Sequence, residues 1–346
     1  MQAQDIRSML PEELKTAMEA LGEKPFRAKQ IFQWLTRGVE QFSEMTNLPE
    51  ALREKLHKQF TLTVPKLETK QTSQTDGTIK YLWQLADGNC VETVLMGHHH
   101  GNTVCISSQV GCRMGCSFCA SAIGGLVRNL EPSELLAQVL FTEKDSGRAI
   151  SNIVLMGIGE PLDNFEHVLR FLKLVNHPDG LHIGMRHITL STCGFVEKID
   201  KLGTYQLQLT LSVSLHAPDD ETRSRLMPIN RQGGVAELLA ACKRYFDQTG
   251  RRVSFEYAMI DGVNDSAAQA ELLAELIGPV GGHVNLIPLN PVRERELTPS
   301  GPDAIVQFTS ILRKNGVNVT VRRSLGGDID ASCGQLRRRR EKEGTP

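Results

Sequence analysis

The spacing of apolar positions changes along the chain. In residues 1 to about 62, apolar side chains such as Leu14 and Met18 recur every three or four positions, which is typical of amphipathic helices. Pro11, followed by two glutamates, marks the start of the first helix. Two further helices are expected, around Phe32 and after Pro49. The first part of the chain is therefore predicted to be helical.

Between residues 63 and 97 the pattern changes to short alternating stretches. Strands are expected at 61–64, 79–85 and 90–95, with turn signals around Gly77 and Gly88. We interpret them as an antiparallel β extension that joins the helices to the rest of the chain. Glu92 is most simply a residue of a solvated strand face. His98–His100 are read as a solvated loop, because three consecutive histidines of a strand cannot all face one ion.

From Thr103 onward, strand patterns alternate with helical patterns. Strands are expected at 104–107, 152–156, 187–191, 209–215, 253–259, 283–287 and 317–322, and helices at 133–144, 165–175, 235–246, 269–277 and 304–314. This alternation predicts right-handed βαβ units and a parallel sheet. Six or seven units are too few for a complete eight-fold barrel, so an α/β fold with a partial (βα) barrel is expected. Cys242 lies on a helical apolar stripe and is interpreted as core.

Three parts are therefore expected: a helical accessory domain with its β extension at 1–97, the barrel at 98–327, and a C-terminal loop with a basic tail at 328–346. The formal net charge of the 346 residues is −1, so any nucleic acid must bind to local basic patches. The basic residues of the N-terminal helices indicate either solvated faces or an RNA-docking domain. Other candidate phosphate contacts are Arg128, Arg322, Arg323 and Arg337–Arg340, although the last run fits a disordered tail equally well.

Cysteine usage and hydropathy indicate the compartment. No apolar run approaches the ~20 residues needed to cross a bilayer, and the N-terminus lacks the apolar region of a signal peptide. Eight cysteines without such a signal indicate a reducing cytoplasm, where thiols serve metals or catalysis. We therefore expect a cytoplasmic protein without a membrane partner.

Three of the cysteines form the most informative motif of the chain. Cys112, Cys116 and Cys119 are spaced as C-x3-C-x2-C, and Phe118 precedes the last of them. Three thiolates from one loop are too few for a closed four-ligand zinc site. They suit a [4Fe-4S] cluster in which one iron lacks a protein ligand and can bind a small molecule. A zinc site completed by a distant Cys or His is the alternative.

Polar and glycine residues follow several of the expected barrel strands. Because the carboxyl ends of parallel strands lie at one end of a barrel, these residues are predicted to form a small-molecule cradle above the cysteine loop. Its candidate members are Gly159, Glu160, Ser191, Ser214, Leu215, His216 and Asn290. Glu160 can accept a hydrogen bond from an ammonium group.

Two further cysteines, Cys105 and Cys333, lie outside this motif. Taken alone, Cys105 is a buried strand cysteine and Cys333 an inert loop thiol. The C-x3-C-x2-C motif, however, resembles that of the radical S-adenosylmethionine (SAM) superfamily, which implies a partial (βα)6-type radical SAM barrel. The chain also resembles the adenine-C2 RNA methyltransferase family (RlmN). This second resemblance rests on segments 25–31, 104–112, 119–130, 157–162, 214–218, 227–230 and 333–336.

The resemblance implies a reaction that consumes two SAM molecules. One SAM methylates Cys333, and a second, bound at the open iron, is cleaved to a 5′-deoxyadenosyl radical. This radical takes a hydrogen atom from the S-methyl group, and the resulting carbon radical adds to C2 of adenine. Cys105 then assists release and is left in a disulfide with Cys333. Either Glu92 or Cys105 is implied as the proton acceptor.

The same resemblance implies the partners. The substrates are adenosines of 23S rRNA, at the peptidyl-transferase centre, and of the tRNA anticodon loop. An electron donor such as flavodoxin or ferredoxin is implied, and we expect a monomer. A sister group (Cfr) methylates C8 instead, but its members tend to have Ala where this chain has Pro161. The C8 enzyme and a non-enzymatic iron–sulfur or zinc RNA-binding protein are the alternatives.

Overall fold

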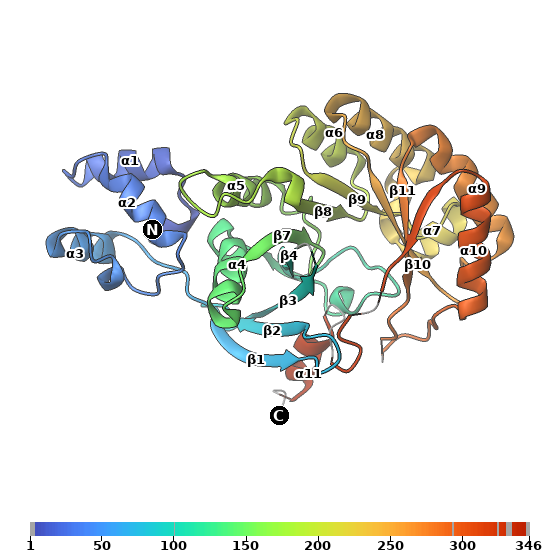
Figure 1. Cartoon of the computed structure of the whole chain (residues 1–346), viewed down its shortest axis with the longest axis horizontal. Helices are drawn as coiled ribbons and strands as arrows, with labels where there is room; N and C mark the ends of the chain where they lie inside the picture. Colours follow the sequence, from blue (N-terminus) through green and yellow to red (C-terminus); the bar gives the residue numbers. More distant parts are fainter. Residues whose placement is uncertain (1–3, 100, 293, 324, 330–333, 344–346) are drawn as a thin grey trace.

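The computed structural model describes residues 4–99, 101–292, 294–323, 325–329 and 334–343. Figure 1 shows a helical N-terminal part beside a larger α/β part. A ten-stranded sheet runs through the α/β part in the order β1-β2-β3-β4-β7-β8-β9-β10-β11-β12. No helix among the described residues is both long and apolar enough to span a membrane.

The three expected N-terminal helices are confirmed as α1 (Pro11–Ala20), α2 (Arg27–Leu35) and α3 (Glu50–Gln59). The Glu13 carboxylate accepts the Leu10 N–H at 2.8 Å at the start of α1 and also pairs with Arg170 of the barrel. Fully buried Arg7 donates to the Val39 carbonyl and lies over the Phe141 ring. These contacts dock the helices against the barrel.

The β extension consists of β1 (Lys66–Thr72), β2 (Ile79–Gln84) and β3 (Cys90–His98), paired antiparallel with one another and with β4. The expected second and third strands are confirmed. The strand expected at 61–64 is wrong, because the first strand lies at Lys66–Thr72. This edge strand buries little and carries polar side chains, so it has no apolar alternation to reveal it. His98 and His99 are exposed at the β3–β4 turn.

Seven parallel strands form the partial barrel. They are β4 (Gly101–Cys105), β7 (Ile150–Leu155), β8 (Ile188–Thr192), β9 (Thr210–Ser214), β10 (Ser254–Met259), β11 (His283–Pro288) and β12 (Asn318–Val321). The intervening helices are α4 (Pro132–Ser146), α5 (Phe165–Asn176), α6 (Val196–Thr204), α7 (Asp220–Leu226), α8 (Gly234–Thr249), α9 (Ala267–Ile277) and α10 (Pro302–Lys314). The predicted partial barrel is confirmed, whereas α6 and α7 were not expected. A small hairpin, β5 (Gln109–Gly111) and β6 (Leu126–Asn129), flanks the cysteine loop.

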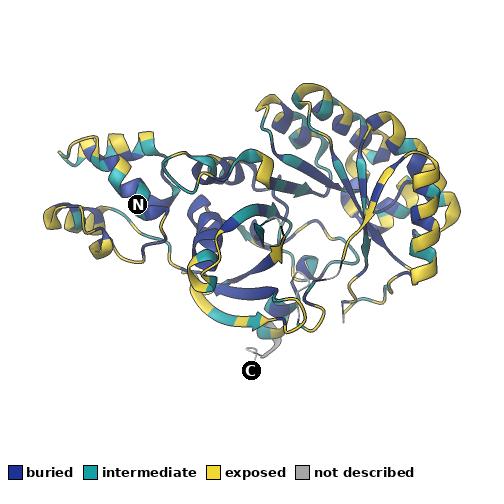
Figure 2. Ribbon diagram, viewed as in Figure 1, coloured by how far each residue is buried: buried dark blue, intermediate teal, exposed yellow. Residues whose placement is uncertain are grey.

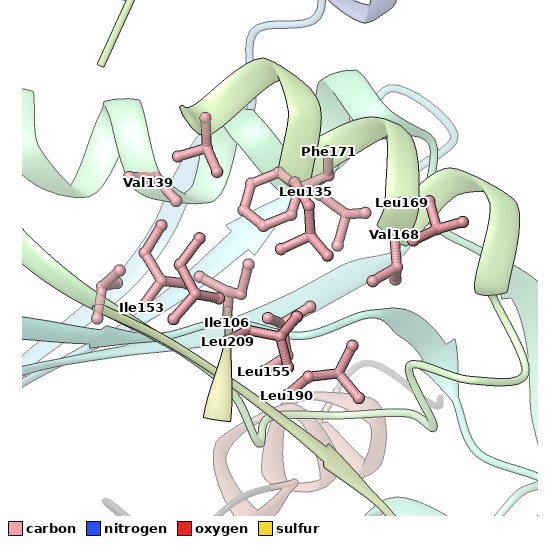
Figure 3. Packing of buried hydrophobic residues seen from close by; sticks show 14 of the residues in the cluster. Ile106, Leu135, Val139, Ile153, Leu155, Val168, Leu169, Phe171, Leu190 and Leu209 are labelled. Carbon is pink, nitrogen blue, oxygen red and sulfur yellow. The ribbon is translucent and has the colours of Figure 1, made fainter. Parts of the chain in front are cut away.

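The core lies between the sheet and the helices that cover its outer face. Figure 2 shows many buried residues on the strands and alternating buried and exposed residues along these helices. Leu135 of α4 and Phe171 of α5 meet Ile153 of β7 there (Figure 3). Cys242 of α8 is also fully buried, which confirms its interpretation as a core residue. This packing fixes the outer face, so the inner face and the strand ends remain available for chemistry.

The last helix of the described residues is α11 (Gln335–Glu343), so the basic run is not a disordered tail over these residues. Figure 1 shows α11 beside the strands of the β extension. Arg340 pairs with Glu68 of β1 at 2.9 Å. The helix covers β3, and Glu92 is only 3% exposed. The prediction that Glu92 belongs to a solvated strand face is therefore wrong.

Candidate active site

The cysteine motif lies in the loop between β5 and β6. Cys112, Cys116 and Cys119 all line one cavity of about 280 Å³ at the barrel mouth. The Cys112 N–H donates to the Gly125 carbonyl at 2.9 Å, and the Ser117 N–H donates to the Leu226 carbonyl at 2.9 Å. Only glycine fits at position 111, because the Cβ of any other residue would clash with the Gly125 carbonyl oxygen. The loop is therefore held by its own hairpin and by α7.

Burial favours the neutral form of these thiols. Removal from water raises the pKa of Cys112 to about 12 and also raises that of Cys116. Such groups are stable as thiolates when they bind cationic metal. No three His, Cys, Asp or Glu side chains of the described residues converge on a single ion. A four-iron cluster does not require this convergence, because each thiolate binds a different iron, so the donor set fits it.

The segment after β7 forms the opposite wall. Gly157 and Gly159 let this segment pack closely against another part of the chain. A Cβ at Gly157 would lie 2.6 Å from the Ile106 carbonyl oxygen, and a Cβ at Gly159 would lie 2.6 Å from Cβ of Gln109. Glu160 is buried, and its oxygens accept the N–H groups of Leu162 (2.9 Å) and Cys193 (2.7 Å). Burial raises the pKa of Glu160 despite these bonds.

The ends of the next strands complete the cavity. Ser191, Ser214, His216 and Asn290 all line it, as expected. Leu215 is fully buried in the core and is not among the residues that line the cavity. Its main chain instead holds the strand end, because its N–H donates to the Glu256 carbonyl. The structure thus brings six of the seven expected cradle residues to one cavity.

His216 is held as a neutral ring. Its Nδ1 accepts the Ala258 N–H at 2.9 Å, so the ring proton lies on Nε2. Burial lowers the pKa of His216 to about 3. Phe118 packs edge-on against the ring, with centroids 4.8 Å apart. The aromatic residue of the cysteine motif therefore ties the cluster loop to the cradle.

Sequence reasoning missed three polar residues of this site. Arg223 of α7 is fully buried and donates to the carbonyls of Cys193, Ser214 and Leu215 and to the Asn230 side chain. Cys193 and Glu256 also line the cavity. Burial raises the pKa of Cys193 well above its ordinary value. The Ser-Thr-Cys sequence at the end of β8 was a signal for Cys193, whereas nothing in the sequence marked Arg223.

A second cavity, of about 400 Å³, adjoins the first. It contains Cys105 at the end of β4 together with Arg323. Both cavities share Met156, Ile287, Asn290 and Arg322 in their walls. The cavity that contains Cys105 is therefore separated from the cavity of the cysteine triad only by these shared residues. Cys333 lies outside the described residues, but the adjacent Gly334 is described.

The expected catalytic Glu92 is held away from both cavities described above. Its Oε2 lies 2.9 Å from Nζ of fully buried Lys80. Glu92 also accepts the N–H groups of Gly334 (2.6 Å) and Arg337 (2.7 Å). The carboxylate thus joins β3 to the start of α11.

The candidate phosphate contacts divide into two groups. Arg128 pairs with Asp87 at 2.6 Å and with Glu134 at 2.7 Å, so its charge is already neutralised, contrary to expectation. Arg340 is likewise paired with Glu68. Arg322 and Arg323 are exposed at the second cavity and remain candidates.

The barrel and its three-cysteine loop define a radical SAM protein, and residues 106–273 match the model of the Radical SAM superfamily. Residues 4–62 match the ribosomal RNA large subunit methyltransferase N-terminal domain. The chain belongs to the RlmN family of dual-specificity RNA methyltransferases. Its RlmN relative from Desulforamulus reducens is 52% identical, over 98% of this chain and 97% of the relative.

Further relatives agree with this assignment. The RlmN relative from Bacillus subtilis is 52% identical, over 96% of this chain and 93% of the relative. A crystal structure of a radical SAM methyltransferase from Sphaerobacter thermophilus superposes with a TM-score of 0.92 at 44% identity, covering 96% of this chain and 98% of that one. The family implies a [4Fe-4S] cluster and SAM, which the donor set of the first cavity fits.

Proposed function

We propose that this protein methylates C2 of adenosine in 23S rRNA and in tRNA. One observation carries the proposal: the cavity of the cysteine triad shares a wall with the cavity that contains Cys105. The proposed reaction needs the SAM site and the Cys105 thiol within reach of one base. The family membership and the RNA-methyltransferase match at residues 4–62 support the same substrate class.

Each proposed site residue has a role that its surroundings support. Cys112, Cys116 and Cys119 would hold the cluster, which supplies the electron that cleaves SAM. Glu160 offers a buried carboxylate to the SAM ammonium. Ser191, Ser214 and Asn290 offer hydroxyl and amide groups from the strand ends. The roles of Gly159 and Leu215 are to shape the main chain at the strand ends. The neutral ring of His216 offers its Nε2–H group as a donor.

The two thiols act in sequence. The Cys333 thiolate takes a methyl group from SAM, which leaves as S-adenosylhomocysteine. After hydrogen abstraction, the S-methylene carbon forms a bond to adenine C2. The C2 proton then passes to a base, and one electron would return to the oxidised cluster, so the adenine regains its aromatic ring. The Cys105 thiolate next attacks the Cys333 sulfur and forms a disulfide. The electron pair of the broken sulfur–carbon bond stays on the methylene carbon, which takes up a proton and becomes the methyl group.

Mass spectrometry of digested RNA tests this proposal. The reconstituted enzyme should convert an unmethylated RNA fragment to 2-methyladenosine, identified with authentic 2-methyl and 8-methyl standards. An 8-methyl product would contradict the C2 assignment and establish the alternative. A protein that binds RNA and iron without methylating either substrate would contradict enzymatic function.

Two variants assign the thiols. Cys333→Ala should give neither methylated protein nor methylated RNA. Cys105→Ala should still acquire a methyl group on Cys333 and then stall with RNA covalently attached. Normal turnover by Cys105→Ala, or label on another residue, would contradict these roles.

Finer expectations about partners belong to the same proposal. We expect a cytoplasmic monomer that takes its electron from a flavodoxin or ferredoxin. We propose Arg322 and Arg323, which are exposed at the second cavity, as contacts of the RNA phosphates. Light scattering and turnover with each purified reductant test these points, and a stable dimer would exclude the monomer.

A further inference from the structure

A buried ion pair lies outside both cavities described above. Lys80 of β2 and Glu92 of β3 are 0% and 3% exposed, and their Nζ and Oε2 atoms are 2.9 Å apart. The pairing of Leu82 with Glu92, and of Lys80 with Val94, puts both charged side chains on one face of the sheet. Burying two charges costs free energy that an apolar pair would avoid. The pair therefore calls for a role beyond stability.

That role follows from what Glu92 holds. Its Oε2 accepts the Gly334 N–H at 2.6 Å, and its Oε1 accepts the Arg337 N–H at 2.7 Å. These amides belong to the first turn of α11, where N–H groups lack partners within the helix. A carboxylate is the favoured group at this end of a helix. Glu92 thus caps a helix that lies far from it in the sequence, and Lys80 balances the charge.

Gly334 makes a second contact that fixes its position. Its φ is +80°, and a Cβ would lie 2.9 Å from the Ser121 backbone nitrogen. Ser121 follows the last cluster cysteine, Cys119, by two residues. The residue next to Cys333 is therefore held between the Glu92 carboxylate and the end of the cluster loop.

We propose that the Lys80–Glu92 pair positions Gly334, the residue next to Cys333, and the start of α11, so that Glu92 is a positioning residue rather than the proton acceptor. This inference rests on the proposed function, in which Cys333 carries the methyl group. Both Glu92 oxygens already accept hydrogen bonds from α11, and Lys80 adds an ion pair. Proton acceptance by Glu92 would weaken the contacts that hold Gly334 and the start of α11. Cys105, in the second cavity, is left to take the proton.

The experiment compares Lys80→Met and Glu92→Gln in the reconstituted full-length enzyme. Both substitutions nearly preserve side-chain length. The glutamine side chain would turn an N–H toward a backbone N–H of α11, and the methionine side chain would leave the Glu92 carboxylate without its ion pair. The matched control is Glu68→Gln, which removes the charge of the partly buried ion pair between Glu68 and Arg340 of the same helix and leaves Glu92 unchanged. Iron content and unfolding temperature show whether each variant folds.

Two readouts are needed. Hydrogen exchange reports the clamp, by which we mean the hydrogen bonds of the Gly334 and Arg337 amides to Glu92. Amides at the start of α11 should exchange about tenfold faster or more in both variants. In the control variant they should exchange at the wild-type rate. Single-turnover methylation of Cys333 without RNA reports positioning. Its rate should fall about tenfold or more, with the half-saturating SAM concentration within about twofold of wild type. A proton acceptor would instead leave this step unchanged and stall after RNA addition.

The double variant Lys80→Met/Glu92→Gln should be no slower than the worse single variant, because the two side chains act as one unit. Unchanged exchange at α11, or normal Cys333 methylation in both single variants, would overturn the inference. A wild-type enzyme that places no methyl group on Cys333 would instead refute the proposed function. The exchange data would then still decide whether the clamp exists.

Discussion

Replacing Arg223 by lysine should destabilise the protein and weaken SAM binding together. Arg223 is 1% exposed and donates to three backbone carbonyls, at 2.8, 3.0 and 3.1 Å, and to Asn230 at 2.7 Å. A lysine ammonium cannot reproduce this planar fork, so about two of the four acceptors would lose their donor. Each buried acceptor left unpaired costs roughly 1–3 kcal/mol. The total is roughly 2–6 kcal/mol.

The expected loss of SAM affinity follows from which carbonyl groups lose their hydrogen bond to Arg223. They belong to Cys193, Ser214 and Leu215, at the ends of β8 and β9, where the cradle is built. Thermal unfolding and a SAM titration of the reconstituted protein measure the two effects. The matched control is Arg225→Lys, because Arg225 is an exposed residue of the same helix and should change stability by less than about 0.5 kcal/mol. Equal unfolding temperatures of the two variants would refute the reasoning.

Further predictions concern the cofactor and the pH response. Cys116→Ser should lose most of the iron of the reconstituted protein, whereas Cys193→Ser should retain it; zinc in place of iron, or equal loss, would contradict the ligand assignment. Glu160→Gln should weaken SAM binding by roughly 1.5–3 kcal/mol in a titration, and unchanged affinity would count against the ammonium contact. The pKa of His216 in the folded protein, about 3, lies below its ordinary value of 6.5, so the folded protein resists protonation. Its contribution to stability is present above about pH 6.5 and is lost as the pH falls toward 3. Urea unfolding of His216→Asn should therefore show a weaker loss of stability over that range, and an unchanged pH profile would refute the assignment.

The barrel could be predicted because its signals are local. Buried strands and amphipathic helices carry their period in the sequence, and the cysteine motif and the strand-end residues lie beside those elements. Helix α6 also had a signal, since Ile199 and Leu202 are buried at helical spacing. Helix α11 had almost none, because Leu336 is its only apolar residue among those whose side chains are described. It is held by distant partners.

The residues that sequence reasoning misjudged depend on tertiary contacts. Glu92 alternates with apolar residues as a solvated strand residue does, and only the helix that covers it makes it buried. Arg128 was taken as available for phosphate because its partners, Asp87 and Glu134, lie on other elements. Leu215 lies between two residues that line the cavity, Ser214 and His216, yet its own side chain belongs to the core. Burial of charge and the direction of side chains are set by packing, which one sequence does not display.

The arrangement of residues beside the active site depends on whether the length of the β2–β3 hairpin changes by an odd or an even number of residues. Lys80, Glu92 and Val94 lie on one face, and Val94 pairs directly with Cys105 of the first barrel strand. Shifting this pairing by a single residue would turn the whole row to the opposite face. Two-residue changes preserve the face, whereas one-residue changes do not. Length variation in this hairpin is therefore constrained to even steps within its strands, and odd steps must be absorbed by turns such as the one at Gly88.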